Sequence, residues 1–394
     1  MTRSFVFSGL TAGVLAVGGL IAGLPGASAM PAHPGVGVHA VHVCTTHPKP
    51  GHAACLAMAV VGPAGKVVTG TRADPLVGFH AADVQKAYHL KGLQADGRTV
   101  AIVDAFGYSH LQSDLAQFRK MNNLPACTRK TGCLRVLDQR GGHNYPPDNA
   151  RWDPEQALDV DMVSAACPTC TILMVQADKS TFKSLEAAEN TAAKQPGVVA
   201  ISNSYGGGQG SNSPAYDHPG IAVTASTGDS GYAPANLYPA SDTNVVAVGG
   251  TSVFKDGSRR GYHETAWSGA GSGCSTTNPA PRWQQQVNTS CKQMDATADV
   301  AAAADPGNGG LVIVLNGHTA QYGGTSEASP LIAAVFALSG RTTGHPAKYL
   351  YADPQDLHDI TSGRNGGCGS PLCRAGNGWD GPTGLGTPHG VAAF

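Results

Sequence analysis

From residue 79 onward, short apolar runs rich in valine and isoleucine alternate with stretches of helical periodicity. Runs so little broken by polar residues are typical of strands buried on both faces. Their alternation with helices predicts an α/β domain built on a mostly parallel β-sheet with helices on both faces. The expected strands are Thr99 to Ala105, Thr171 to Gln176, Val198 to Asn203, Ile221 to Ser226, Asn244 to Gly249 and Leu311 to Leu315. The expected helices are Ser113 to Met121, Pro154 to Ala165, Thr181 to Lys194 and Ser326 to Leu338.

The composition is that of a loop-rich globular protein with a large core. A chain of 394 residues with 41% hydrophobic content can form one large domain and a small appendage. The 52 glycines and 26 prolines indicate many tight turns. The net charge of −1 shows none of the excess of basic residues that is typical of nucleic-acid binding. The 15 histidines make the chain cationic in acid.

The first 29 residues have the features of an export signal. Arg3 supplies the positive start, Phe5 to Leu24 the apolar stretch, and Ala27-Ser28-Ala29 a small-residue cleavage site before Met30. The alternative is an uncleaved membrane anchor, but the glycines and the cleavage site favour removal. We therefore expect a secreted, extracellular protein that has no membrane association after signal removal.

Residues 30–77 form a short segment of different composition, rich in proline, glycine and histidine, ahead of the expected domain at 78–394. An apolar run from Ala53 to Val61 lies within it, and a hairpin tied by Cys44 and Cys55 is one possible arrangement. We expect an N-terminal accessory or pro-segment. Its histidines (His33, His39, His42, His47 and His52) could bind a metal, but no ligand spacing recurs, which favours a solvated linker.

The ten cysteines fall into close neighbour pairs. In an exported protein this pattern favours disulfides over metal thiolates, although sequence alone leaves the connectivity open. A redox function for Cys167-Pro168-Thr169-Cys170 is disfavoured, since this segment lies between an expected helix and a strand rather than opening a helix. The neighbour pairs are Cys44/Cys55, Cys127/Cys133, Cys167/Cys170, Cys274/Cys291 and Cys368/Cys373.

A candidate nucleophile occurs where a glycine-rich turn leads into the helix expected at Ser326. A serine at a helix N-terminus lies beside unpaired backbone N–H groups, which suit an oxyanion. Such a serine alone is more often a helix cap. The full string Gly324-Thr325-Ser326-Glu327-Ala328-Ser329-Pro330 resembles instead the nucleophile motif of the subtilisin-like superfamily.

Carboxylates stand where a subtilisin would carry its histidine base. The His-Gly-Thr-His type motif is absent, while Asp104 resembles the aspartate that ends the first strand. Glu155 and Asp159 are four residues apart and so share one face of the expected helix. Asp153 is the expected cap, with Pro154 at the first helical position. An isolated acidic first turn would be read as solvated and favoured by the helix dipole.

An aspartate stands at the end of another expected strand, in the segment Thr224 to Gly231. A subtilisin would carry there the asparagine of its oxyanion hole, and this chain carries Asp229. A carboxyl group can donate a hydrogen bond to an oxyanion only when it is protonated. In isolation, an aspartate in this context is a common turn residue.

Taken together, these motifs resemble the sedolisin family of serine-carboxyl peptidases, which are acid-active relatives of subtilisin. The resemblance covers roughly Phe79 to Phe394 and implies a subtilisin-like fold and a secreted serine-type endopeptidase. It assigns Ser326 as nucleophile, Glu155 as general base and acid, Asp159 as its hydrogen-bonding partner and Asp229 as oxyanion donor. The matching segments are the Glu-x-x-x-Asp helix, the Ser-x-Gly-Asp-Ser-Gly loop, the stretch from Tyr238 to Thr251 and the Gly-Thr-Ser run.

The C-terminal region resembles the calcium site of the same family. Carboxylates and exposed carbonyls in glycine-rich turns suit a hard cation with oxygen ligands. The resemblance implies one structural Ca²⁺, bound by the side chains of Asp359 and Asp380 and the backbone oxygens of Ile360, Gly376 and Gly378. Without the resemblance, these residues would be a cluster of turns.

Two departures leave parts of the assignment open. Sedolisins usually carry a long folded prosegment, and only about 45 residues are available here, so autocatalytic maturation does not follow. Asn203 to Gly210 resembles a substrate-cleft strand but lacks the acidic residue that often follows it, so no substrate preference carries over.

The alternatives are a subtilisin-type enzyme that uses Asp104 with His143 or His110, and a silent binding protein on a peptidase scaffold. The expected partners are protein or peptide substrates, not nucleic acid, and the expected form is a monomer.

Overall fold

Eight strands form the main sheet of the computed structural model, which describes residues 1–2, 37–70, 76–341 and 343–394. The strand order is β13-β12-β10-β8-β5-β7-β6, and β16 also pairs with β12. All of these pairings are parallel except that of β12 with β13, which confirms the α/β fold expected from the sequence. The strands are β5 (Thr99–Ala105), β6 (Leu134–Asp138), β7 (Thr171–Ala177), β8 (Val198–Asn203), β10 (Ala222–Ser226), β12 (Val246–Lys255), β13 (Tyr262–Ala266) and β16 (Val300–Ala303).

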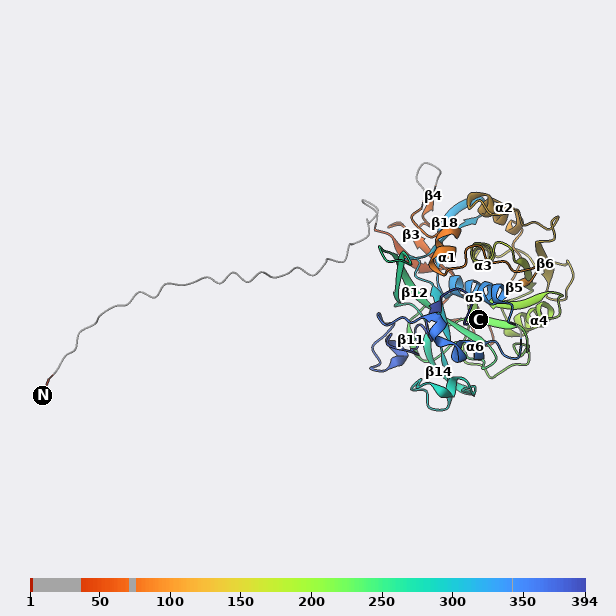
Figure 1. The fold of residues 1–394 in the computed structure, drawn as a ribbon. Coiled ribbons are helices and arrows are strands. Elements are labelled where there is room, and N and C mark those ends of the chain that lie inside the picture. Colours follow the sequence, from red (N-terminus) through yellow and green to blue (C-terminus); the bar gives the residue numbers. More distant parts are fainter. Residues whose placement is uncertain (3–36, 71–75, 342) are drawn as a thin grey trace. The chain divides into compact units, whose positions relative to one another are not determined.

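Helices cover both faces of this sheet (Figure 1). Because side chains alternate along a strand, Val100 and Ile102 of β5 face the core shared with α3 and α5, whereas Ala101 and Val103 face α4. The two central helices, α3 and α5, pack directly against each other. The helices are α1 (Ala81–Ala87), α2 (Leu111–Met121), α3 (Asp153–Ala166), α4 (Phe182–Ala193), α5 (Thr325–Ser339) and α6 (Ala347–Ala352).

A second, antiparallel sheet lies next to the main one and has the order β1-β3-β18-β17, with β4 paired to β18. The run Leu311–Leu315, expected as one more buried strand, is β17 of this smaller sheet. Its strands are β1 (His39–His42), β3 (Met58–Val61), β4 (Thr69–Gly70), β17 (Leu311–Leu315) and β18 (His318–Gly323). The remaining elements are β2 (Ala54–Cys55), β9 (Tyr205–Gly206), β11 (Tyr232–Ala235), β14 (Ser272–Pro279), β15 (Met294–Thr297), β19 (Leu357–His358), β20 (Thr387–Pro388), η1 (Gln284–Gln286), η2 (Pro354–Asp356) and η3 (Pro371–Cys373).

The N-terminal segment contributes strands to the rest of the molecule, and Gly37–Phe394 form one unit. Strands β1 and β3 pair in register from His39 opposite Val61 to His42 opposite Met58, and the disulfide Cys44–Cys55 closes the connection between them. Strand β3 in turn pairs with β18. The export signal expected at residues 1–29 lies almost entirely outside the described residues.

All five disulfides join the neighbour pairs seen in the sequence. Cys167–Cys170 closes the turn between α3 and β7, where the sequence placed it. Within the described part of the chain, none of the helices has both the length and the apolar character needed to cross a membrane.

Candidate active site

Ser326 lies in the first turn of α5, which begins one residue earlier than expected, at Thr325. Gly324, the residue before the helix, has a φ of 98°, a conformation that residues with a side chain rarely adopt. The chain therefore turns sharply between the end of β18 and the start of α5. Ser326 is fully buried, and its Oγ lies 3.4 Å from the carbonyl oxygen of Ser204, just beyond β8. The serine therefore lies at the carboxyl edge of the sheet, where sites of α/β proteins form.

Pro330 explains part of the Gly-Thr-Ser motif in physical terms. It is four residues after Ser326 and has no backbone N–H, so the carbonyl of Ser326 lacks its usual helical donor. The hydroxyl of Ser204 fills this vacancy, with Oγ 3.3 Å from the Ser326 carbonyl oxygen. The proline thus leaves the Ser326 carbonyl free to be held by Ser204, which follows β8.

Glu155 and Asp159 lie on one face of α3, as their spacing predicts, but both are fully buried and are not part of a solvated acidic turn. Burial, then the nearby charges of Asp104 and Glu155, raise the pKa of Asp159 well above its ordinary range. Its Oδ1 lies 2.9 Å from Ser204 Oγ. A hydroxyl has one proton, so Ser204 can bond both Asp159 and the Ser326 carbonyl only if Asp159 is protonated and donates to it.

Glu155 lies next to Ser326 and is fully buried. Its Oε2 accepts a hydrogen bond of 2.7 Å from the backbone N–H of Ala57, while Oε1 has no partner among the described residues. Burial raises the pKa of Glu155 to about 8, and hydrogen bonds from Ser326 and the backbone partly oppose this rise. The start of its helix differs from expectation. Trp152, not Asp153, is the cap residue, and Asp153 is the first residue of the helix.

Asp104 is the second-to-last residue of β5 and completes a group of buried carboxyls with Glu155 and Asp159. Neither of its oxygens has a described hydrogen-bond partner. Burial, and next the charge of Glu155, raise the pKa of Asp104 well above its ordinary range. A buried carboxyl without a cationic partner is far more stable when neutral than when charged. The Asp104 carboxyl is therefore protonated in this environment.

Asp229 lies in the loop after β10 and faces the start of α5. Its Oδ1 accepts hydrogen bonds from the backbone N–H of Thr325 at 2.6 Å and from Thr325 Oγ1 at 2.9 Å. Its Oδ2 has no partner among the described residues. Burial raises the pKa of Asp229 to about 7, although the two bonds from Thr325 oppose this rise. Below that pH the unpartnered oxygen can carry a proton and act as a donor.

Residues 54–57 lie in the cleft among these side chains, which the sequence did not reveal. Strand β2 pairs antiparallel with β9, with Ala54 opposite Gly206 and Cys55 opposite Tyr205. The backbone N–H of Leu56 then donates to the Ser204 carbonyl over 3.2 Å. Together with the bond from Ala57 to Glu155, these contacts hold the segment extended across the cleft.

The peptide bond between Leu56 and Ala57 lies between Glu155 and Asp229. A Cβ atom added to Gly324 would come 2.3 Å from the Leu56 carbonyl oxygen and 2.9 Å from Asp229 Oδ2, so that oxygen is on the Asp229 side. The N–H of Ala57 is on the Glu155 side. The next residues are also paired, since Met58 lies opposite Gly323 of β18.

A cavity of about 220 Å³ lies beside Leu56. Its walls include Gly206 of β9, Gly228 before Asp229, and Leu237. The position of a Cβ on Gly206 would be 3.5 Å from Leu56 Cδ1, so the leucine side chain contacts this wall. The wall that Leu56 contacts, formed by Gly206 and Leu237, is apolar, while polar residues such as Ser230 and Asn236 line other parts of the cavity.

The histidines considered as an alternative base lie elsewhere. His143 is exposed, with Nδ1 3.0 Å from the hydroxyl of Tyr145, and His110 is an exposed residue just before α2. Among the described residues, the hydrogen bonds of Ser326, Glu155, Asp159 and Asp229 involve no imidazole.

The residues expected to bind calcium lie close together near the C-terminus. Asp359 Oδ2 accepts from the N–H of Gly378 at 2.9 Å, and Asp380 Oδ2 accepts from the N–H of Gly376 at 3.2 Å. Burial raises the pKa of Asp380 to about 7, and the charge of Asp359 adds to the rise. Neither carboxylate has a cationic side chain as partner within the described chain. Two neighbouring carboxylates without a cation fit a site for a hard metal ion.

Comparisons with known proteins agree with this geometry. The model of the subtilase family matches residues 148–349. The chain is similar to kumamolisin from Bacillus sp. (strain MN-32), with 30% identity over 350 residues, 78% of this chain and 62% of the relative. It is also similar to sedolisin from Pseudomonas sp. (strain 101), with 28% identity over 337 residues, 74% of this chain and 56% of the relative. The chain therefore spans less than two thirds of either relative.

A solved structure of Pseudomonas sedolisin, a serine-carboxyl proteinase complexed with two molecules of pseudo-iodotyrostatin, is similar in fold. The TM-score is 0.66 at 25% identity, covering 79% of this chain and 95% of the sedolisin chain.

Proposed function

The chain belongs to the sedolisin family of subtilisin-like proteins, and we propose that it is a serine-carboxyl endopeptidase that hydrolyses peptide bonds in acid through an acyl-enzyme on Ser326. The observation that carries this proposal is the position of the peptide bond between Leu56 and Ala57. Its carbonyl oxygen is on the Asp229 side of the cleft, and its nitrogen is hydrogen-bonded to Glu155. A substrate bond in this place would have a donor for its oxygen and an acid for its leaving nitrogen.

The reaction follows from the roles of three side chains. Glu155 takes the proton of Ser326 Oγ as that oxygen attacks the carbonyl carbon, and protonated Asp229 donates to the developing oxyanion. Glu155 then returns the proton to the leaving nitrogen as the C–N bond breaks, which leaves the acyl group on Ser326. A water molecule, deprotonated by Glu155, then attacks the ester carbonyl; the C–Oγ bond breaks, Glu155 returns the proton to Ser326 Oγ, and the acid product leaves. Asp159 and Ser204 position Glu155 and Ser326.

The mechanism requires Glu155 to be ionised while Asp229 is protonated. In the covered cleft, burial raises both pKa values, that of Glu155 to about 8 and that of Asp229 to about 7, so both carboxyls hold protons in acid in this state. Residues 55–57 contribute to the burial of Glu155, and a charged Asp229 raises its pKa further. Protonation of Asp229 removes a charge that raises the pKa of Glu155, and this favours an ionised Glu155 beside a protonated Asp229.

A protein-substrate assay from pH 2 to 8 tests the proposal on the wild type, Ser326→Ala and Glu155→Gln. We expect a bell-shaped acidic profile for the wild type, no activity in Ser326→Ala, and a loss of about 10²–10⁴-fold in kcat for Glu155→Gln. Activity that peaks above neutral pH and persists in Glu155→Gln would instead indicate a histidine-based enzyme. Failure of a serine-directed probe to label Ser326 at any acidic pH would indicate a silent scaffold.

We further propose that the chain up to Leu56 is a pro-segment whose residues 54–56 occupy the substrate cleft, and that the bond between Leu56 and Ala57 is its cleavage site. The antiparallel pairing with β9 and the contact of Leu56 with the cavity wall support this proposal. They also indicate a preference for substrates with leucine, or an apolar residue of that size, on the acyl side of the cleaved bond.

Acidification of the purified full chain tests the pro-segment. We expect N-terminal sequencing to show a new start at Ala57 together with the onset of activity, and neither change in Ser326→Ala. Leu56→Asp should slow the cleavage at least about tenfold, because the apolar contact of Leu56 with the wall at Gly206 would be replaced by a polar carboxyl group. Full activity of a chain whose Leu56–Ala57 bond is intact would overturn the pro-segment but not the peptidase.

One structural Ca²⁺ is proposed at Asp359 and Asp380, with backbone oxygens of Ile360, Gly376 and Gly378 as further ligands. The ion would neutralise the two carboxylates and tie their loops together. We expect a calcium chelator to lower the melting temperature of the Ser326→Ala chain at pH 7, and added Ca²⁺ to restore it. The Asp380→Asn variant should show no calcium-dependent change.

Secretion is proposed as well. The five disulfides support it, because such bonds persist in oxidising compartments outside the cytosol.

A further inference from the structure

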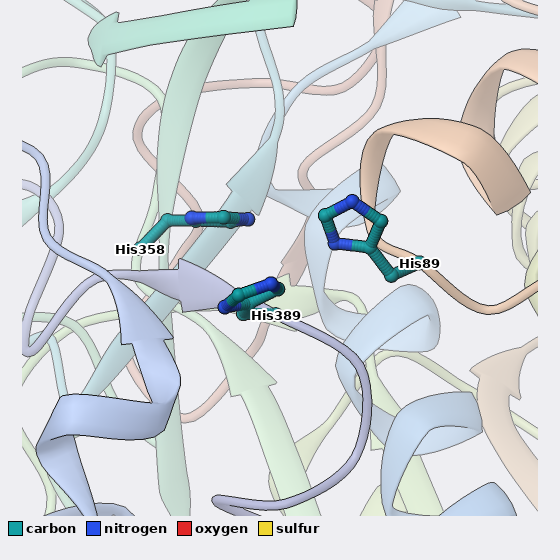
Figure 2. Close-up of side chains that lie close together, drawn as sticks. All are labelled: His89, His358 and His389. Atoms are coloured by element: carbon teal, nitrogen blue, oxygen red, sulfur yellow. The ribbon is translucent and has the colours of Figure 1, made fainter. Parts of the chain in front are cut away.

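Three histidines that are far apart in the sequence lie together on the surface. His89 follows α1, His358 is in β19, and His389 comes directly after β20. One possible ligand nitrogen of each ring lies within 4.8 Å of those of the other two. Figure 2 shows a nitrogen of each ring facing the space between the three. The ring centroids are 4.3 Å apart for His358 and His389, and 4.8 Å for His89 and His389.

The backbone holds the three positions together without help from the imidazoles. Strand β19 pairs with β20, with His358 opposite Thr387. The N–H of Gly390, next to His389, donates to the carbonyl of Tyr88, next to His89, over 3.0 Å. The convergence of the rings therefore follows from fixed neighbouring segments, which is a requirement for a preformed binding site.

The chemistry of the cluster is that of neutral nitrogen ligands. His358 Nε2 is buried and has no hydrogen-bond partner among the described residues, which costs free energy in the absence of a ligand. Arg260 is a cationic side chain close to His358. Arg260 itself is paired with Glu264, with Nη2 2.5 Å from Oε2, which offsets its charge.

We propose that His89, His358 and His389 form a binding site for a divalent transition metal of the zinc class. Imidazole nitrogens suit such ions and not calcium, and three histidines leave one tetrahedral position for water. Nitrogens that share a tetrahedral zinc ion lie roughly 3.3 Å apart, so the rings must close slightly. His89 and His389 are exposed and free to rotate about their side-chain bonds. The ion would join the C-terminal strand pair to the end of α1.

Metal titration of the full-length Ser326→Ala chain at pH 7.5 tests the site, with Ca²⁺ present in excess to fill oxygen sites. We expect one equivalent of Zn²⁺ to bind and to raise the melting temperature. Co²⁺ should give the visible absorption of a tetrahedral nitrogen site. His389→Gln and His89→Asn should each weaken Zn²⁺ binding at least about 100-fold, beyond the 10–100-fold typical of second-sphere changes. Asparagine is chosen because residue 89 has a φ of 55°, which asparagine tolerates.

The matched control is the His39→Gln/His47→Gln double variant, since these exposed histidines lie in the N-terminal segment and could bind zinc adventitiously. It should bind zinc as tightly as the parent. The proposal is overturned if zinc affinity survives in His389→Gln and His89→Asn, or if it disappears in the double variant.

Discussion

At the scale of single residues, the candidate site is defined by where protons reside. Asp104, Glu155, Asp159 and Asp229 are buried together, and burial is the leading cause of the raised pKa of each. A carboxyl can donate to an oxyanion only while it is protonated. The role proposed for Asp229 therefore depends on its protonation state, in a way that an asparagine at the same position would not.

Substitution of Asp229 separates donation from titration. Asp229→Ala removes the donor and should lower kcat about 10²–10³-fold. In Asp229→Asn, the amide oxygen can accept from Thr325 as Oδ1 does now, and the NH₂ group takes the place of Oδ2. Because an amide donates at every pH, Asp229→Asn should recover much of the activity and extend it to higher pH. The measurement is the profile of kcat against pH for the wild type, Asp229→Ala and Asp229→Asn.

An unchanged alkaline limb in Asp229→Asn would show that the loss of the Asp229 proton does not limit the reaction. Thr325→Val is the control, since it keeps the volume of the side chain but removes the hydroxyl bond to Asp229. Loss of that hydrogen bond should raise the pKa of Asp229, and the alkaline limb of the kcat profile should therefore move to higher pH, as in Asp229→Asn.

The structure brings together residues that the sequence singled out as candidates, but the sequence did not predict their environment. The four-residue spacing places Glu155 and Asp159 on one helical face, and the motif identifies Ser326. The burial of both carboxyls, and the contact of Ser204 with Asp159 and Ser326, arise from α3 packing against α5. Tertiary contacts of this kind have no local pattern in the sequence.

At the scale of elements, the segment that fills the cleft is a strand added to the edge of the site. Strand β2 has two residues, so its own pairing with β9 is weak. The disulfide Cys44–Cys55 restrains the chain just before Leu56 and closes a sequence separation of 11 residues. A loop of this length loses enough chain entropy on closure for the bond to contribute about 2–4 kcal/mol.

Removal of that disulfide should loosen the segment. In the Ser326→Ala background, Cys44→Ser/Cys55→Ser should bind a fluorescent peptide with leucine at the cleavage position at least about tenfold more tightly, because the tethered segment competes less well. Fluorescence anisotropy measures the affinity. The control is Cys127→Ser/Cys133→Ser, a short-loop disulfide outside the cleft, which should leave the affinity unchanged. Equal affinities for both double variants would contradict the competition.

Elements with a strong period were predictable, and short antiparallel ones were not. The apolar runs at β5, β7, β8 and β10 were predicted to within a residue or so. Strands β1 and β18 contain polar residues and are stabilised by pairing with β3 and β17. Strand β1 pairs with β3, which lies beyond the Cys44–Cys55 loop, so no window of local sequence indicates it. Strand β18 follows β17 directly through Asn316-Gly317, which is a local hairpin signal, although no strand was expected there.

At the scale of the whole molecule, buried carboxyls make the fold itself depend on pH. Glu189, Asp161 and Glu327 are fully buried outside the candidate site, and burial raises the pKa of each. Such groups outnumber the carboxyls whose pKa is lowered, such as Glu264 beside Arg260. A folded state in which carboxyls have raised pKa values binds more protons than the unfolded chain.

The free energy of unfolding should therefore fall as the pH rises. A group with a raised folded-state pKa stabilises fully below its unfolded pKa, and this stabilisation is lost as the pH rises through the folded value. For Asp229 the rise from 3.8 to about 7 corresponds to about 4 kcal/mol lost between pH 4 and pH 7. Thermal unfolding of the Ser326→Ala chain between pH 4 and pH 8 should give the highest melting temperature at pH 4.

The Asp229→Asn/Ser326→Ala chain provides the matched comparison, because an amide neither gains nor loses a proton over this range. Its melting temperature should fall less steeply between pH 4 and pH 7 than that of Ser326→Ala alone. A melting temperature that rises with pH would mean that histidines with lowered pKa values, such as His358 and His218, control the stability instead. A melting temperature that falls as the pH rises is expected of a fold whose buried carboxyls are kept neutral in the acid in which the proposed peptidase works.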